Sequence, residues 1–246
     1  SPLIGSSGVP DKKYWEADGI KISGLIGSNY IDTPSHFQSK QTLSDWLKEE
    51  KIPALEIADT RFLAQKIRTK GTILGKIVFN NDDIKFHDPN TENLVAKVST
   101  KIVYDYTLGV GYVDTRRKKQ KTVLLIDCGA KGNIAKCLLK RGIRVVTVPW
   151  DFDPFSNSEP LSAGVNLNHP KGGHLRFDAI VISNGPGDPK MADKTITTIK
   201  YAISKKIPIL GVCLGNQILA LAANGDTRKL KFGHRSQNQP CIMEGS

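Results

Sequence analysis

In the segment Pro208-Ile-Leu-Gly-Val-Cys-Leu-Gly-Asn-Gln217, an apolar run leads into a thiol flanked by two glycines, and this pattern indicates the fold of the chain. The apolar residues of Ile207–Val212 predict a buried strand, and Gln217–Ala223 predicts the helix that follows it. A sharp turn from strand to helix strains the backbone of its central residue, Cys213, and flanking glycines remove the Cβ atoms that would clash there. This pattern is typical of a nucleophile elbow, with Cys in place of the usual Ser.

Two interpretations of this turn are open. In the first, the amide dipoles of the helix stabilise a thiolate at Cys213, and the N–H of Leu214 points to the place where an oxyanion would form. In the second, Cys213 is a buried cysteine in a glycine-containing core turn, which is where free cysteines most often lie. The turn alone does not separate a catalytic role from a structural one.

A second glycine-rich loop, Ser183-Asn-Gly-Pro-Gly-Asp-Pro189, favours the catalytic interpretation. It ends an expected strand at Phe177–Ser183, and its two glycines can present backbone amides to a substrate with no side chain in the way. On its own this loop would serve equally well as a tight turn. Because both loops follow expected strands of one parallel sheet, at the edge where ligands bind, together they predict an active site.

Strands and helices alternate on either side of these loops. Strands are expected at Val123–Ile126 and Arg144–Val148, with a helix at Asn133–Lys140 between them and another helix at Lys194–Ser204. This order predicts an α/β domain over residues 121–246, built on a parallel sheet with both faces covered.

Residues 1–105 predict a smaller α+β domain, in which no set of residues indicates catalysis by its spacing. The expected elements are a surface helix at Thr42–Glu50, a helix from Asp59 or Thr60 to Arg68, and an apolar strand at Ile73–Phe79.

The composition describes a globular chain of 246 residues, 39% hydrophobic and 24% charged. No apolar run approaches the roughly 18 to 20 residues of a membrane span, and the N-terminus lacks a signal-peptide pattern. We therefore expect a cytoplasmic protein with no membrane partner. The four cysteines show no CxxC spacing, which predicts reduced thiols and no metal site, and they are Cys128, Cys137, Cys213 and Cys241.

The chain carries 35 Lys and Arg against 24 Asp and Glu, a net charge of +11 that raises nucleic acid as a partner. The excess is scattered, and its densest cluster has no interleaved aromatic residue. We interpret residues 106–120 as a solvated basic linker and expect no nucleic-acid partner, with a polyanion site as the alternative. The cluster consists of Arg116, Arg117, Lys118, Lys119 and Lys121.

The two loops, Asn184–Pro189 and Gly211–Gln217, resemble the class I (triad) glutamine amidotransferases. Their flanks, Asp127–Ile134 and Lys231–Pro240, narrow the resemblance to the small chain, or glutaminase region, of carbamoyl phosphate synthetase. The first domain agrees, so that the resemblance spans nearly the whole chain. Its segments that resemble the first domain of that family are Pro2–Gly5, Thr33–His36, Ile52–Pro53, Asp59–Arg61 and Gly71–Thr72.

The resemblance implies hydrolysis of the side-chain amide of glutamine, with the ammonia passed to a synthetase partner. By similarity, Cys213 attacks the amide carbon and forms a thioester. The amides of Gly185 and Leu214 hold the oxyanion. Gly187 and Gln217 help to fix the glutamine. The resemblance implies no cofactor in this chain, since ATP and Mg²⁺ are used by the synthetase large chain or domain, which serves pyrimidine or arginine synthesis.

Two departures from the family pattern bear on activity. Asn216 stands where the family usually has His. The chain ends at Ser246, before the family's Gln-Asn-His-Gly-Phe and His-Pro-Glu motifs, and it begins inside the family's first domain. We therefore expect a fragment of a longer protein or an incomplete pseudo-subunit, inactive in isolation.

The alternative to an enzyme is a non-catalytic module that docks on the synthetase partner. The Asn216 change and the missing motifs allow it, whereas the retained Cys213 favours the enzyme. We expect none of the histidines to replace the missing base, and they are His36, His87, His169, His174 and His234.

Overall fold

A computed structural model describes most of the chain, and its residues group into two compact units. The first unit comprises Ser1–Asp11, Ile22–His87 and Arg228–Ser246, and the second comprises Lys12–Lys21 and Asp88–Thr227. The residues that the structure describes are 3–80, 83–106, 120–156 and 175–231.

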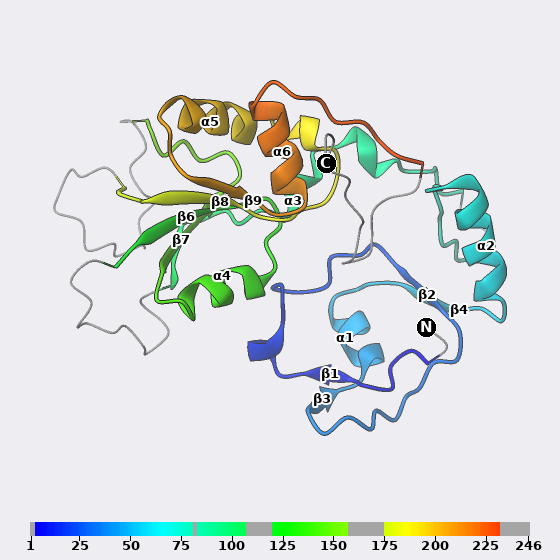
Figure 1. The fold of residues 1–246 in the computed structure, drawn as a ribbon. Helices are drawn as coiled ribbons and strands as arrows, with labels where there is room; N and C mark the ends of the chain where they lie inside the picture. The colour runs from blue at the N-terminus through cyan, green and yellow to red at the C-terminus, as the bar shows by residue number, and fades with distance from the viewer. Residues whose placement is uncertain (1–2, 81–82, 107–119, 157–174, 232–246) are drawn as a thin grey trace, which may run out of the picture. The chain divides into compact units, whose positions relative to one another are not determined.

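A sheet forms the centre of the second unit, and its strands are β5 (Tyr104–Asp105), β6 (Thr122–Asp127), β7 (Arg144–Pro149), β8 (Ala179–Ile182) and β9 (Ile209–Gly211). Among the described residues the strand order is β5-β7-β6-β8-β9 (Figure 1). The last four strands in this order are parallel, and only β5 runs antiparallel to its neighbour. The sheet is therefore mostly parallel, which confirms the predicted α/β class.

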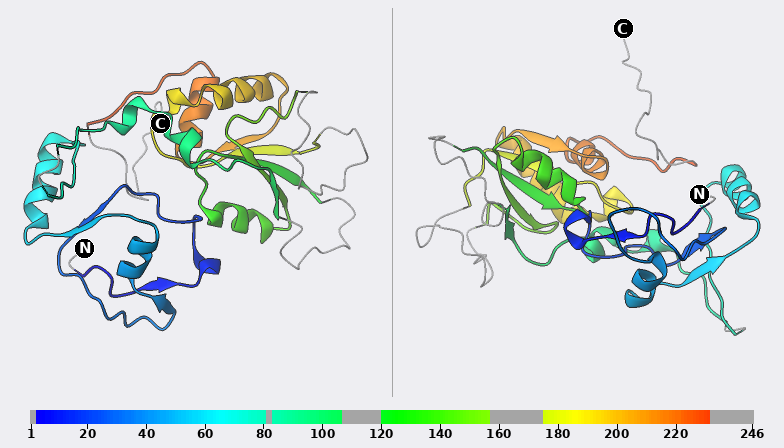
Figure 2. Two further views of the ribbon diagram at one scale, coloured as in Figure 1. Left: turned by 180° about the vertical axis from the view of Figure 1, so that it is seen from behind. Right: turned by 90° about the horizontal axis from the view of Figure 1, so that it is seen from below.

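Helices cover both faces of this sheet (Figures 1 and 2). On one face lies α4 (Gly132–Leu139), and on the other lie α5 (Asp193–Ser204) and α6 (Leu214–Ala222). Alternate side chains of a strand point to opposite faces of the sheet, and helices cover both faces here. All six residues of β6 are therefore buried. Leu124 thus packs in the core beneath α5 and α6, and Leu125 packs in the core beneath α4.

The second unit also includes residues that precede the predicted amidotransferase domain. Val95 lies in α3 (Leu94–Val98), and Val95 and Val103 both belong to the larger core cluster. The boundaries of the two compact units therefore differ from the domain boundary predicted after residue 105. That division stays a prediction, because a compact unit is defined by contacts and not by independent folding. The short 3₁₀ helices of the second unit are η1 (Lys12–Tyr14), η2 (Pro89–Thr91) and η4 (Pro189–Met191).

The upstream segment Lys12–Lys21 joins the second unit through the start of α4. The backbone oxygen of Glu16 accepts a hydrogen bond from the N–H of Gly132 at 2.9 Å, and its carboxylate accepts one from the N–H of Asn133 at 2.8 Å. Lys131, the residue at the N-cap of α4, makes no side-chain capping bond. Glu16 therefore caps α4 from more than a hundred residues away in the sequence, and its negative charge lies at the positive end of the helix.

The first unit contains two small sheets and two helices, which are β1 (Val9–Pro10) with β3 (Ser39–Gln41), β2 (Leu25–Gly27) with β4 (Ala54–Glu56), α1 (Leu43–Glu49) and α2 (Thr60–Lys70). Both predicted helices are confirmed. Of the two residues predicted to begin α2, Asp59 is its N-cap, because its carboxylate accepts a hydrogen bond from the N–H of Phe62 at 2.8 Å. Gly71 ends the helix with φ 86°.

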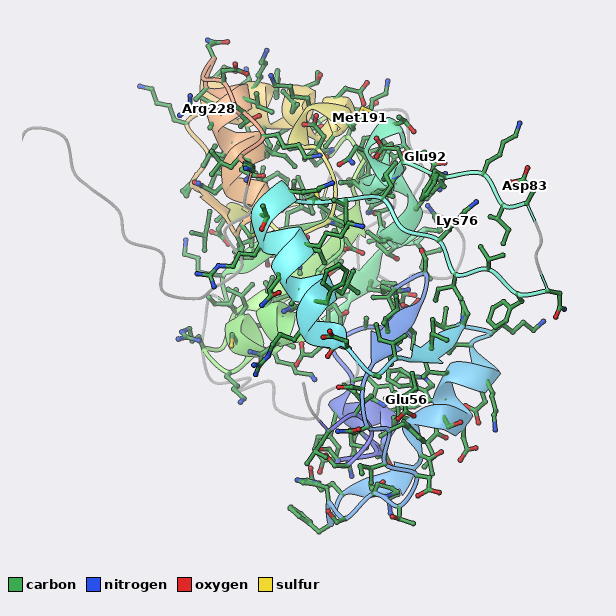
Figure 3. The ribbon with its side chains drawn as sticks, turned by 90° about the vertical axis from the view of Figure 1, so that its right-hand side faces the viewer. Glu56, Lys76, Asp83, Glu92, Met191 and Arg228 are labelled. Carbon is green, nitrogen blue, oxygen red and sulfur yellow. The ribbon has the colours of Figure 1, made fainter. Side chains whose placement is uncertain are left out.

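The strand predicted at Ile73–Phe79 is wrong. These residues form neither helix nor strand, and Figure 3 shows Lys76 and Asp83 on an extended segment. The side chains of Leu74, Val78 and Phe79 are exposed. An apolar, β-branched run forms a strand only where a neighbouring strand pairs with it, and the described residues provide none.

Several expectations fall partly or wholly outside the described residues. They concern the linker at 106–120 with most of its basic cluster, and the residues Cys241, His169, His174 and His234. Among the helices that the structure describes, none has the length and apolar character that a membrane span requires.

Candidate active site

Cys213 occupies the turn between β9 and α6 with φ 54° and ψ −109°. Positive φ values are costly for residues with a Cβ, and such strain persists where the surrounding structure imposes it, often at active sites. The thiol is exposed. This is the geometry predicted for a nucleophile elbow, and an exposed thiol does not fit the alternative of a buried core cysteine.

The two glycines that flank the thiol are required by the packing of the turn. A Cβ at Gly211 would lie 2.5 Å from the backbone of Gly215 and Asn216, and a Cβ at Gly215 would lie 2.3 Å from the backbone oxygen of Ile182. These contacts are shorter than any that real Cβ atoms make, and the atoms they meet are backbone atoms. The strand and the helix can therefore approach this closely only with glycine at both positions.

The first turn of α6 begins one residue after the thiol. The backbone oxygen of Cys213 accepts hydrogen bonds from the N–H groups of Asn216 and Gln217, at 3.0 and 3.3 Å. In the described part of the chain, no oxygen accepts a hydrogen bond from the N–H of Leu214. The amide of Leu214 is thus available beside the thiol, and the side chains of Asn216 and Gln217 are exposed at the same end of the helix.

The loop after β8 lies next to this turn. Ile182 is paired in register with Gly211, so both loops leave the sheet at the same edge. A Cβ on Gly185 would lie 2.7 Å from Cδ2 of Leu214, which shows that the structure brings these two residues together. Gly187, in the same loop, has φ 84° and faces Leu94. The predicted residues therefore converge at the carboxyl edge of β8 and β9, and their roles stay predictions.

A third loop, Asp127–Lys131, completes this edge. The sequence pointed to it only as part of the flank Asp127–Ile134 that resembles the family, and assigned it no role in the site. It follows β6, which pairs with β8. The carboxylate of Asp127 accepts hydrogen bonds from the N–H groups of Gly129 and Ala130, at 2.8 and 2.7 Å. An Asp at the end of a buried strand, with Gly two residues later, is a signal for such a side-chain-to-backbone turn and could have indicated this geometry.

Cys128, in this third loop, is a second thiol near the site with a different environment. It is fully buried, and burial raises the pKa of its thiol to about 12. Only thiolates are effective nucleophiles, so Cys128 is inert at neutral pH. Of these two cysteines, only Cys213 is suited to attack a substrate.

Among the residues that the structure describes, no histidine that could serve as base lies in the unit that carries Cys213. Within the described residues, histidines occur only in the first unit, as His36 and His87. His36 is exposed, its ring stacks on Phe37 with centroids 4.6 Å apart, and its Nδ1 accepts a hydrogen bond from the N–H of Gln38 at 3.2 Å. The same residues contain no group of three or more His, Cys, Asp or Glu suited to a metal ion.

Two family models match the chain. The model described as glutamine amidotransferase class-I matches residues 124–246, which is half of the chain. The chain therefore belongs to the class I glutamine amidotransferases. A second model, described as carbamoyl-phosphate synthase small chain, CPSase domain, matches residues 1–77. This pair of matches confirms the resemblance drawn from the sequence motifs.

Similar proteins align with nearly all of the chain. The chain is 40% identical to the multifunctional protein CAD of Squalus acanthias over 258 residues, and 39% identical to the multifunctional protein pyr1-3 of Dictyostelium discoideum over 257 residues. It is 38% identical to the mitochondrial carbamoyl-phosphate synthase (ammonia) of Homo sapiens over 253 residues. These alignments cover 100%, 98% and 98% of this chain, but only 10%, 11% and 15% of the relatives' own lengths.

Proposed function

We propose that this chain is the glutaminase component of a glutamine-dependent carbamoyl phosphate synthetase. The observation that carries the proposal is the exposed thiol of Cys213 on a strained elbow, with the amide of Leu214 and the loop of Gly185 beside it. The family match and the presence of a carbamoyl-phosphate synthase among the relatives support the same assignment. The ammonia would pass to a synthetase partner, which would use ATP and Mg²⁺.

The chemistry proceeds in two steps. The thiolate of Cys213 attacks the side-chain amide carbon of glutamine, a C–S bond forms, and the carbonyl electron pair moves onto oxygen. The N–H groups of Gly185 and Leu214 donate to that oxyanion, and a preorganised donor of this kind contributes about 10² to 10³-fold to kcat. The C–N bond then breaks, the nitrogen takes up a proton and leaves as ammonia, and water hydrolyses the thioester to glutamate.

The test is Cys213→Ser in the full-length protein that contains this chain. Glutamine-dependent carbamoyl phosphate synthesis should fall by at least about 10³-fold, because a serine hydroxyl cannot replace the thiolate at this site. Synthesis from added ammonia should stay unchanged, because only glutamine hydrolysis uses the thiol. Cys137→Ser is the matched control, since Cys137 lies on α4, away from the elbow. Loss of both activities in Cys213→Ser would point to a structural role and overturn the proposal.

The second candidate is a docking module that binds the synthetase partner without hydrolysing glutamine. One observation favours it: the name of the human relative specifies ammonia, so similarity to these proteins does not by itself imply use of glutamine. Asn216, in place of the usual His, lies exposed beside the elbow and agrees with either candidate. The docking module would be favoured if the wild-type protein made carbamoyl phosphate only from ammonia and Cys213→Ser left that rate unchanged.

Three finer assignments stay proposals. The carbamoyl phosphate would serve pyrimidine or arginine synthesis, and the synthetase partner would be a separate chain or a domain of the same chain. A cytoplasmic location is proposed from the sequence, whereas the name of the human relative places that protein in mitochondria.

A further inference from the structure

The side chain of Asn184 bridges two loops at the carboxyl edge of the sheet. Its Nδ2 donates a hydrogen bond to the backbone oxygen of Gly129 at 3.0 Å, and its Oδ1 accepts one from the N–H of Lys131 at 3.1 Å. The side-chain amide of Asn184 therefore hydrogen-bonds to both ends of one turn, once as a donor and once as an acceptor. Asp, which has the same shape, lacks the donor.

Ser183 holds the peptide group between Asn184 and Gly185. Its hydroxyl is fully buried, accepts a hydrogen bond from the N–H of Cys128 at 2.9 Å, and donates one to the backbone oxygen of Asn184 at 2.7 Å. That oxygen belongs to the same planar peptide group as the N–H of Gly185. Fixing the carbonyl therefore fixes the direction in which the Gly185 N–H points.

The turn to which Asn184 binds is itself rigid. The carboxylate of Asp127, which is 9% exposed, binds the N–H groups of Gly129 and Ala130 through Oδ1 and the N–H of Thr100 through Oδ2, the last at 2.7 Å. Gly129 has φ 115°, and a Cβ there would lie 2.9 Å from a methyl group of Val98. These contacts hold the turn independently of Asn184.

Gly185 lies directly against this turn. A Cβ on it would come within 2.1 Å of the backbone oxygen of Cys128 and 2.7 Å of Leu214. No oxygen in the described residues accepts a hydrogen bond from its N–H. The available N–H of Gly185 is thus carried by a peptide group that Ser183 and Asn184 fasten to the loop after β6.

We propose that Ser183 and Asn184 are positioning residues, which aim the Gly185 N–H at the oxyanion of the glutaminase reaction. The inference rests on the proposed function. Neither side chain would touch glutamine or the thiol in this role. An N–H that stabilises an oxyanion acts mainly in the transition state, so a displaced donor should lower kcat and leave KM nearly unchanged.

The experiment compares Asn184→Asp with wild type in the full-length protein. We expect kcat for glutamine-dependent synthesis to fall by about 10- to 100-fold, less than the loss of a whole donor, with KM within about threefold. Ammonia-dependent synthesis and the rate at which iodoacetamide modifies Cys213 should be unchanged, because the partner and the elbow are intact. Asn93→Asp is the matched control, since it removes a comparable donor, the Nδ2 bonded to the backbone oxygen of Met191 at 2.8 Å.

Ser183→Ala is the second variant and covers the case in which Asn184→Asp does not fold. A kcat equal to wild type in either folded variant would overturn the positioning role, as would a loss shared equally by the Asn93→Asp control. Failure of the proposed function has a separate signature, because the wild-type protein would then show no glutamine-dependent synthesis at all.

Discussion

Two cysteines near the carboxyl edge of the sheet show how strongly local environment decides chemistry. Cys213 is exposed on a strained turn, whereas Cys128 is fully buried in the loop that directly follows the central strand β6. The sequence singled out Cys213 by its two flanking glycines, which a strand-to-helix turn requires, but did not predict the burial of Cys128. The buried thiol has a measurable consequence for stability at high pH.

Burial raises the pKa of Cys128 to about 12, from an ordinary value of about 9. Below pH 9 the thiol is protonated in both states and adds no pH dependence. Between pH 9 and 12 the unfolded chain loses the proton that the folded chain keeps, so the free energy of unfolding falls as the pH rises. We expect the free energy of unfolding, measured by urea titration, to fall between pH 8 and pH 10.5 by about 1–2 kcal/mol more in wild type than in Cys128→Ala.

The comparison between the two proteins removes other groups that titrate in this range. Burial also raises the pKa of Tyr106, and that group is present in both proteins, so its effect cancels in the difference. Equal pH dependence in wild type and Cys128→Ala would contradict the prediction.

The contacts of Asn184 could not be predicted in the same way as the glycines. The need for glycine at 211 and 215 is local, because the clash arises within the turn and the strand beside it. The partners of Asn184 lie more than fifty residues away in the sequence, on a loop whose position depends on the pairing of β6 with β8. Only the assembled sheet brings the three loops together.

At the scale of elements, caps and periodicity were predictable and strand pairing was not. The helix starts predicted at Thr42 and Asp59 are confirmed, because each residue caps its helix through a contact within one turn. The strand predicted at Ile73–Phe79 failed, and the antiparallel strand β5 was not foreseen, since each depends on a partner far along the chain. Two residues make up β5, so a side-chain contact must help to hold it.

That contact is the ion pair between Asp105 on β5 and Arg144 on β7. The carboxylate accepts hydrogen bonds from Nη2 and, at 3.1 Å, from Nε, and the Asp105 side chain is 2% exposed while that of Arg144 is 29% exposed. Removing one partner of a mostly buried pair removes the attraction that offsets the desolvation of the other charge. We expect Arg144→Gln to lower the free energy of unfolding by about 2–3 kcal/mol in urea titrations.

A double-mutant cycle separates the pair from its surroundings. Asp105→Asn combined with Arg144→Gln should cost clearly less than the sum of the two single changes, because each single change already removes the attraction between the two charges and the second change cannot remove it again. Additive effects would show that the two side chains contribute independently.

At the scale of the whole molecule, the buried core is distributed unevenly. In the described part of the first unit, the buried hydrophobic side chains are those of Val9 and Leu47, whereas both core clusters belong to the second unit. The sequence predicted two regions of different architecture, but exposure depends on packing that composition does not reveal. Local stability should follow the amount of buried apolar surface.

Hydrogen exchange compares two helices of similar length. The helix α2 has no buried residue, whereas α5 buries Thr195, Thr198, Ile199 and Ala202. An eleven-residue helix that buries no side chain is marginal in water, so the amides of α2 should exchange at least about 10²-fold faster than those of α5. Mass spectrometry of the exchanging chain measures both helices in one sample, and equal protection would contradict the prediction.

The hydrogen bonds between Glu16 and the start of α4 have a consequence for gene recombination. Because Glu16 lies upstream of the first unit's main segment, the second unit is encoded by two separate stretches of the gene. A recombination that joined residue 88 onward to a foreign leader would carry the sheet and the elbow but lose the carboxylate that caps α4. A rearrangement that keeps this cap has to transfer residues 12–21, and with them the intervening first-unit segment, together with the amidotransferase region.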